Sequence, residues 1–390
     1  MPITIEQNKR IYVLTISNKG LRVDFEDEEI LRHWDVEPTP DRDQPDTPPI
    51  PDQEGEDEPP ENEEETPPAT GTRVANRAEL LNVLATTNGG SYLLDPGNYG
   101  SIRIAGKDYS SPVNLRPNNH AHMPTFDGFI IEDSSNVFVD GMFMNYDYNP
   151  GDNVWHWPFS AIDSHNFAFR GCHFLGDKNH VGLPTGRALI IRRCHHFNVI
   201  QNVVERWDRG FIWDDISFAA VLENQLFDLT SDAMEIALIT DSNLSHNRMH
   251  DFDRNRGAGV HPDMMMIWSH SPTHPLARIK ANFNTFEIGN GAWTQSLTFF
   301  SNKSGLPHED LEAFGNTIHN AHLHGITMGK TVGGKVNNNT LTAVAGMNAP
   351  VEIPQINLDG GSTNMQVHNN KTPKTIVTQS GWYVAGNVVG

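Results

Sequence analysis

Three consecutive segments of the chain read RALIIRRCHHFNVIQN (residues 187–202), RGFIWDDISFAAVLEN (209–224) and DAMEIALITDSNLSHN (232–247). Each begins with a charged residue, has a large apolar residue two positions later and ends on asparagine. The pattern continues with first residues Asp263, Gln295 and His324 and with asparagines Asn284, Asn316 and Asn339. The separation between the two columns is 15, 15, 15, 21, 21 and 15 residues. A constant register with the same six-residue excess in two neighbouring repeats indicates a repeat architecture.

The repeat unit is typical of a parallel β-helix. Short β-branched or aromatic runs alternate with Asn, Asp and Gly turns, and no helical pattern follows residue 104. One coil cannot bury its apolar side alone, so coils stack at about 4.8 Å and share a core, with stacked asparagine amides bonded in a ladder. The expected inward residues are Leu189, Phe211, Met234, Met265, Leu297 and Ile326. We expect further coils at 140–141, 170–171, 368–369 and 386–387, and free buried thiols at Cys172 and Cys194.

Residues 75–104 are expected to close the first coil. Ala75–Thr87 reads as a short amphipathic helix with Leu80, Leu81 and Leu84 on its apolar side, and GGSYLLDPGNYGSIRI follows it. A helix there covers an edge that would otherwise promote aggregation. This passage resembles the N-terminal cap of right-handed β-helix proteins of the pectate-lyase-like superfamily. The blocks 261–265, 293–296 and 322–327 resemble β-helix proteins of marine bacteria and their phages, including tailspikes and tail fibres. The resemblance implies a right-handed, all-β solenoid and leaves the activity open.

The chain divides into three parts. Residues 1–36 are expected to form a small attachment segment containing a β-hairpin, Ile11–Ser17 and Leu21–Phe25 around Asn18-Lys19-Gly20. Residues 37–71 are expected to be a disordered acidic linker, because 37–70 holds 13 acidic residues, one arginine and 10 prolines. Residues 72–390 form the β-helix domain. An isolated hairpin is marginal in water, so the first part is expected to pack on a partner or on copies of itself.

Composition narrows the classes of partner. The net charge is −21 and no basic stripe appears, which argues against nucleic-acid binding. No run of 18 apolar residues exists and residues 1–10 lack an apolar signal core, so neither membrane insertion nor ordinary secretion is predicted.

The first column of the repeat is the candidate site. Stacked coils turn it into a surface stripe of cations, carboxylates, amides, imidazoles and an indole, which suits a sugar polymer. The candidate catalytic residues are Asp232, Asp263, His261 and His324, and the candidate substrate-binding residues are Arg187, Arg209, Glu235, Trp293, Gln295 and His322. The plain alternative is that polar residues gather at solvated bends. Trp155 and Trp157 fall in a long coil, where they form either a loop platform or part of the packing; the assignment to packing is favoured.

Two chemistries fit this stripe. Asp232 and Asp263 on successive coils would lie about 4.8 Å apart at their backbones, near the carboxyl separation of glycoside hydrolases. The rival is β-elimination from a uronic acid polymer, with a Lys, Arg or His base and a cation or Ca²⁺ to neutralise the uronate. No other cofactor is expected. His322 and His324 are expected on one strand face, but without a Cys or Glu partner at ligand spacing no metal site is predicted.

Three functions remain open at this point. The first is a phage tailspike or tail-fibre-like receptor-binding protein in the virion tail, a homotrimer joined to a virion tail protein through residues 1–36. It binds host surface polysaccharide, and whether it also cleaves that polysaccharide is left open. The second is an extracellular bacterial polysaccharide lyase or glycoside hydrolase. The third is a structural or adhesive β-helix without catalysis. Whether the chain is an enzyme is left undecided.

Overall fold

The computed structural model describes residues 2–7, 10–17, 20–24, 70–152, 155–179, 182–252, 262–289, 291, 294–301, 305–344 and 353–390. The chain divides into two compact units, Met1–Ala69 and Thr70–Gly390. Almost all of the expected linker at 37–71 lies outside the described residues, so its disorder stays a prediction.

The first unit contains a three-stranded antiparallel sheet. Its strands are β1 (Pro2–Gln7), β2 (Arg10–Ser17) and β3 (Gly20–Asp24), in the order β1-β2-β3. The hairpin expected around Asn18-Lys19-Gly20 is present, with Ser17 opposite Gly20. Strand β1, which was not predicted from the sequence, pairs along its whole length with β2.

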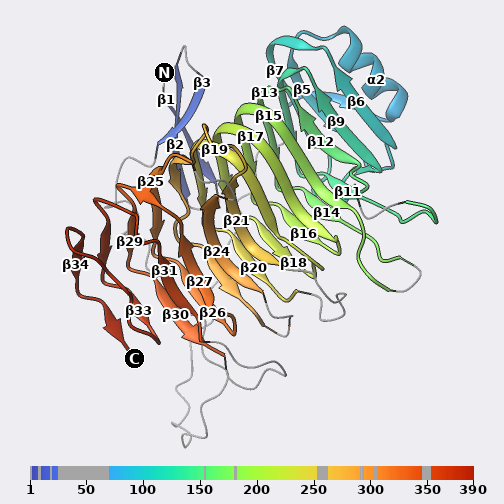
Figure 1. Ribbon diagram of the computed structural model, residues 1–390. Coiled ribbons are helices and arrows are strands. Elements are labelled where there is room, and N and C mark those ends of the chain that lie inside the picture. Colours follow the sequence, from blue (N-terminus) through green and yellow to red (C-terminus); the bar gives the residue numbers. More distant parts are fainter. Residues whose placement is uncertain are drawn as a thin grey trace, which may run out of the picture. The chain divides into compact units, whose positions relative to one another are not determined.

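The second unit is a right-handed parallel β-helix, so the predicted fold class is confirmed (Figure 1). Among the described residues, 21 strands belong to one continuous sheet that covers two faces of the coils: β4 (Thr72–Val74), β5 (Gly90–Leu94), β6 (Ser101–Ala105), β7 (Asp108–Pro117), β9 (Gly128–Glu132), β10 (Ser135–Asp140), β12 (Phe159–Ile162), β13 (His165–Arg170), β15 (Arg187–Ile200), β17 (Arg209–Leu222), β19 (Met234–Ser245), β21 (Asp263–Ser269), β22 (Ala277–Lys280), β24 (Gln295–Ser301), β25 (His308–Phe314), β27 (His324–Met328), β28 (Thr331–Val332), β29 (Lys335–Asn337), β31 (Gln355–Leu358), β32 (Gln366–His368) and β34 (Tyr383–Ala385). Eleven described strands form the third face: β8 (Thr125–Phe126), β11 (Phe143–Asn145), β14 (His173–Leu175), β16 (Val203–Glu205), β18 (Gln225–Phe227), β20 (Arg248–His250), β23 (Thr285–Glu287), β26 (Thr317–Asn320), β30 (Thr340–Ala343), β33 (Lys371–Thr372) and β35 (Val388–Val389).

One coil shows how the chain turns. Strand β15 runs along one face, bends where Arg193 and His196 take φ of 51° and 54°, and continues along the second face. Gln201 at φ 57° starts the next bend, and β16 forms the third face. The three faces therefore enclose a single core.

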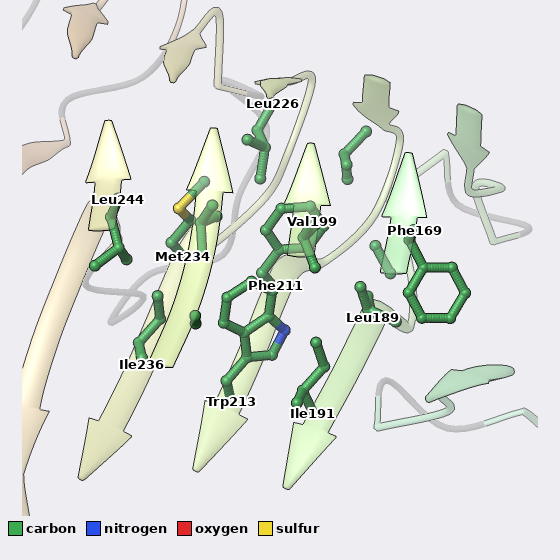
Figure 2. Packing of buried hydrophobic residues seen from close by; sticks show 14 of the residues in the cluster. Phe169, Leu189, Ile191, Val199, Phe211, Trp213, Leu226, Met234, Ile236 and Leu244 are labelled. Carbon is green, nitrogen blue, oxygen red and sulfur yellow. The ribbon is translucent and has the colours of Figure 1, made fainter. Parts of the chain in front are cut away.

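The expected inward column is confirmed. Leu189 pairs with Phe211, Phe211 with Met234, Met234 with Met265, Met265 with Leu297, and Leu297 with Ile326. All six side chains are completely buried. Figure 2 shows Leu189, Phe211 and Met234 on neighbouring strands, directed into the space between the faces. Both cysteines are free and buried, as expected.

The asparagine column forms the predicted ladder. Asn202 donates through its backbone N–H (3.0 Å) and its Nδ2 (2.9 Å) to Oδ1 of Asn224. Asn224 repeats both bonds to Asn247, at 3.1 and 2.9 Å. The same pattern runs on through Asn284, Asn316, Asn339, Asn370 and Asn387. In the coil at 368–369 the ladder residue is Asn370, one position later than the quoted pair, because Asn369 occupies the φ 55° position that precedes the ladder.

A helix covers the first coil. Helix α2 spans Arg77–Thr86, with Asn76 as its N-cap, and buries Leu80 and Leu84. Leu81 was expected on the same side but is half-exposed. In Figure 1 this helix lies at the opposite end of the stack from the C-terminus. Among the residues that the structure describes, no helix is long and apolar enough to cross a membrane.

Candidate functional site

The first column of the repeat lies where the strands of one face begin. Arg187 pairs with Arg209, Asp263 with Gln295, and His324 with Gln355. Asp232 joins the column because its carbonyl accepts the Gly210 N–H at 2.9 Å, and Asp263 follows because its carbonyl accepts the Ala233 N–H at 3.0 Å. The predicted register is therefore confirmed, while the roles of these residues stay predictions.

The six-residue excess lies on the far side of the same face. Ala237 pairs with Trp268, whereas Thr240 pairs with Ala277, so the extra residues fall between Trp268 and Ala277. The next coil carries the same excess, since Phe300 pairs with Trp268 and Glu309 with Ala277. The coils of Asp263 and Gln295 thus leave the regular path between their first and second faces.

Arg209 is the electrostatic centre of the column. Its Nη1 lies 3.3 Å from Oδ2 of Asp232 and also contacts Oε2 of Glu235 in a short hydrogen bond. Its Nε lies 4.0 Å from Oδ2 of Asp208. One guanidinium therefore holds carboxylates from two successive coils. Glu235 was expected beside the column, and Asp208 was not singled out, although it directly precedes Arg209 in the sequence.

Asp232 is the most perturbed acid of this cluster. Its side chain is nearly inaccessible, with the residue only 3% exposed, and its Oδ1 accepts the backbone N–H of Asp263 at 2.9 Å. Burial raises the pKa of the Asp232 carboxyl to about 7; Arg209 opposes this rise, and the neighbouring Asp263 and Glu235 add to it. A carboxyl of this kind holds a proton near neutral pH and can donate it.

Asp263 lies on the next coil, as expected. It is 2% exposed, and its Oδ1 lies 3.4 Å from the Thr298 hydroxyl. The bond from its N–H to Asp232 links the two acids through backbone as well as through charge. Both acids therefore also have a structural role at this bend, which the sequence could not separate from a chemical one.

Glu235 offers a second carboxylate with better access. It belongs to strand β19, where Ile212 and Met266 are its neighbours across the sheet, and its side chain is 17% exposed. Because Glu235 and Asp232 contact the same Arg209 nitrogen, their carboxyl oxygens lie close together. The structure therefore brings Asp232 together with Glu235 at least as directly as with Asp263.

An exposed indole lies beside the two arginines. The ring of Trp155 lies 4.6 Å from the Arg187 guanidinium carbon and 5.8 Å from that of Arg209. Trp155 is 51% exposed, so its assignment to packing was wrong. Trp155 lies a few residues before β12 (Phe159–Ile162), in a segment that has no repeat period, so no pattern in the sequence marked it.

The histidines and the glutamine complete the described part of the column. Gln295 is buried, and His324 is partly exposed, with its Nδ1 at 3.0 Å from the Thr327 hydroxyl. His322 precedes β27, is buried, and its Nδ1 accepts the backbone N–H of His324 at 3.0 Å. The two imidazole rings lie 5.3 Å apart, so the expected proximity of His322 and His324 is present although His322 lies outside the strand. His261 and Trp293 lie outside the described residues. Within the described part of the chain, no group of three or more His, Cys, Asp or Glu side chains is arranged to hold a metal ion.

The comparisons with known proteins concern the fold. No protein-family model matches the sequence, and no curated protein matches it. Among solved structures, the chain is similar to DFA-IIIase from Arthrobacter chlorophenolicus A6 without its lid in complex with GF2, with 14% identity and a TM-score of 0.49 over 76% of this chain and 75% of that chain. It is also similar to the Dettilon tailspike protein, with 10% identity and a TM-score of 0.47 over 82% of this chain and 59% of that chain.

Proposed function

We propose that this protein binds an extended glycan on the face that carries the first column. The observation that supports the proposal most is the exposed Trp155 ring beside Arg187 and Arg209, with Glu235 held by the same Arg209. An indole stacks on the apolar side of a sugar ring, and planar charged groups bond sugar hydroxyls and carboxylates. Successive coils repeat polar positions along the stack, which suits a polymer better than a small molecule.

The organisation of the chain supports a tailspike or tail-fibre-like role. A small β-unit at the N-terminus, a long acidic proline-rich segment and a β-helix follow one another. In this proposal residues 1–36 attach to a virion tail protein, the chain forms a homotrimer, and the β-helix meets polysaccharide on a host cell. The alternative is that the protein is an extracellular bacterial enzyme that acts on polysaccharide.

A specific observation favours glycan cleavage by hydrolysis. The pKa of Asp232 near 7 fits a general acid that gives its proton to the glycosidic oxygen as the bond from that oxygen to the anomeric carbon breaks. Glu235, held by Arg209, would attack the anomeric carbon to form a glycosyl ester, and water activated by Asp232 would then release the sugar and restore both acids. Asp263, His261 and His324 stay candidates for assisting roles.

The test is incubation of the full chain with purified bacterial capsular and O-antigen polysaccharides. Binding is measured by affinity electrophoresis, and cleavage by chain length and by new reducing ends. Hydrolysis gives reducing ends without the ultraviolet absorbance of an unsaturated product, whereas elimination gives both. Binding without shortening supports the adhesive function. Absence of binding to every polysaccharide of the panel would contradict the proposal.

A further inference from the structure

The two arginines of the column, Arg187 and Arg209, differ in the ion pairs that they form with described residues. Arg209 contacts three carboxylates, those of Asp208, Asp232 and Glu235. Arg187, one coil earlier and directly paired with Arg209, forms no ion pair with any described residue. Its Nε is buried and, like the Nε of Arg209, has no hydrogen-bond acceptor among the described residues. The column therefore presents one guanidinium in direct ion pairs and one that has no direct ion pair with any described residue.

The surroundings of Arg187 strengthen the need for an anion. Burial lowers the pKa of Arg187, and the neighbouring Arg209 lowers it further. Both effects disfavour the positive charge in the free protein. Its guanidinium stays charged at neutral pH, since an arginine pKa starts above 12. Glu235 and Asp208 oppose this lowering from a distance, and a negative group placed directly against Arg187 would oppose it more strongly.

The loop that carries Trp155 is held in place beside Arg187. The backbone N–H of Arg187 donates to the backbone carbonyl of His156 at 2.8 Å. The His156 ring stacks on Tyr146 at 5.0 Å, and Tyr146 stacks on the fully buried Trp207 at 5.3 Å. His156, the residue after Trp155, is thus anchored to the core through stacked rings, and the exposed indole of Trp155 lies over the Arg187 guanidinium.

We propose that Arg187 and Trp155 form a subsite for a sugar residue that carries a carboxylate, such as a uronic or other acidic sugar of the bound glycan. The carboxylate would pair with the guanidinium of Arg187, and the apolar side of the ring would stack on the exposed indole of Trp155. This inference rests on the proposed glycan-binding function and names its substrate class. Neutral glycans would lack the ionic contact.

The test uses acidic polysaccharides and their own carboxyl-reduced forms. Alginate, hyaluronan, colominic acid and the acidic members of the capsular panel are each measured by isothermal titration or affinity electrophoresis before and after reduction of their carboxylates to alcohols. The wild type is expected to bind at least one acidic polymer and to lose about 10- to 100-fold in affinity when its carboxylates are reduced, in line with a charged hydrogen-bonded pair.

A matched pair of variants separates the subsite from general attraction. Arg187→Gln is expected to lose about the same factor for the acidic polymer and to bind the reduced polymer as the wild type does. Arg192→Gln removes the same charge five residues further along β15, also from a residue without an ion pair to any described residue, and is expected to change affinity less than about twofold. Trp155→Ala is expected to weaken binding of both polymers, and circular dichroism checks the fold of each variant.

Two outcomes would overturn the inference in distinguishable ways. Equal affinity of the wild type for acidic and reduced polymers, or equal losses in the Arg187 and Arg192 variants, would remove the acidic subsite while leaving glycan binding intact. Binding of neutral polysaccharides alone would do the same. Failure to bind any polysaccharide, acidic or neutral, would remove the proposed function together with this subsite.

Discussion

At the scale of single residues, Asp232 shows how a bend can hold an acid with two roles. Its Oδ1 accepts a backbone N–H from the next coil, its Oδ2 faces Arg209, and burial raises its pKa to about 7. The same contacts that order the bend therefore prepare a proton donor. Stability and activity should respond differently to replacement of this residue.

The pH dependence of stability tests the state of Asp232. The unfolded carboxyl ionises near its model value of 3.8, whereas the folded carboxyl holds its proton to about 7. Stability of the wild type should therefore fall as the pH rises through this window. Asp232→Asn lacks this titration, so its Tm relative to the wild type should rise between pH 5 and 8.

The control is Asp241→Asn. Arg278 lowers the pKa of Asp241, so the relative Tm of that variant should stay flat over this range. A flat profile for Asp232→Asn would show that its carboxyl is ionised in the fold.

The carboxylate pair predicts the stereochemistry of any hydrolysis. The carboxyl groups of Asp232 and Glu235 contact one Arg209 nitrogen. This shared contact favours the carboxyl separation of retaining enzymes, about 5 Å, over that of inverting enzymes, about 6.5–9.5 Å. Proton NMR of the first product should show the anomeric configuration of the substrate. Asp232→Asn and Glu235→Gln should each lower the cleavage rate by about 10²–10⁴-fold. If Asp263→Asn abolishes cleavage while Glu235→Gln does not, the pair across two coils is the correct one.

At the scale of elements, the asparagine ladder joins neighbouring coils at one bend. Each middle asparagine accepts two hydrogen bonds from the preceding rung and donates to the next rung and to a strand carbonyl, as Asn224 does to Asn247 and to Val199. Upstream the same position is held by Cys172, whose N–H still donates to Asn202 at 2.9 Å. The ladder can therefore end on a residue that donates to the next rung only through its backbone, while the Cys172 thiol donates to the carbonyl of Val139.

Substitution in the middle and at the end of the ladder should differ. Asn224→Leu or Asn247→Leu leaves buried donors of the neighbouring rungs unpaired, at about 1–3 kcal/mol for each group. Asn387→Leu should cost less, because Asn370 is the only other ladder asparagine that Asn387 contacts among the described residues, and Asn387 lies in the last described coil. Chemical denaturation of the three variants measures the difference. Equal losses below about 0.5 kcal/mol would mean that the ladder contributes little to stability.

At the scale of the whole molecule, the two compact units differ in how much of a core each one shows. The β-helix carries a continuous buried column from Val74 to Ile376. Residues 1–69 contribute a three-stranded sheet among the described residues. We predict that the β-helix folds without the attachment segment, and this independence stays a prediction.

Deletion of residues 1–69 tests that boundary. The truncated chain keeps α2 and every coil, so it should unfold cooperatively with a Tm within a few degrees of the full chain. It should also lose any trimer that depends on the first unit, which analytical ultracentrifugation of both chains would show. Loss of cooperative unfolding in the truncated chain would place the boundary elsewhere, and a trimer that persists would assign trimerisation to the β-helix.

The coil register could be predicted from the sequence because a solenoid is almost one-dimensional. Each coil contacts only its neighbours, so a residue such as Asn224 needs its partner at a nearly constant distance along the chain, and that constraint is visible as a period. The inward column, the ladder and the alignment of Asp232 with Asp263 follow from this period. The hairpin at 17–20 was visible for a similar reason, since its turn is local.

The chemistry of the column was decided by tertiary structure. Arg187 and Arg209 occupy equivalent positions, yet only Arg209 is surrounded by carboxylates, because Asp208, Asp232 and Glu235 converge on it from two coils. Trp155 reaches Arg187 through a connection that has no repeat period, and no pattern could place it. Periodicity encodes which residues are neighbours. Burial, competition for a shared guanidinium and the course of irregular loops determine the charge and access of each neighbour, and these depend on the whole three-dimensional surroundings.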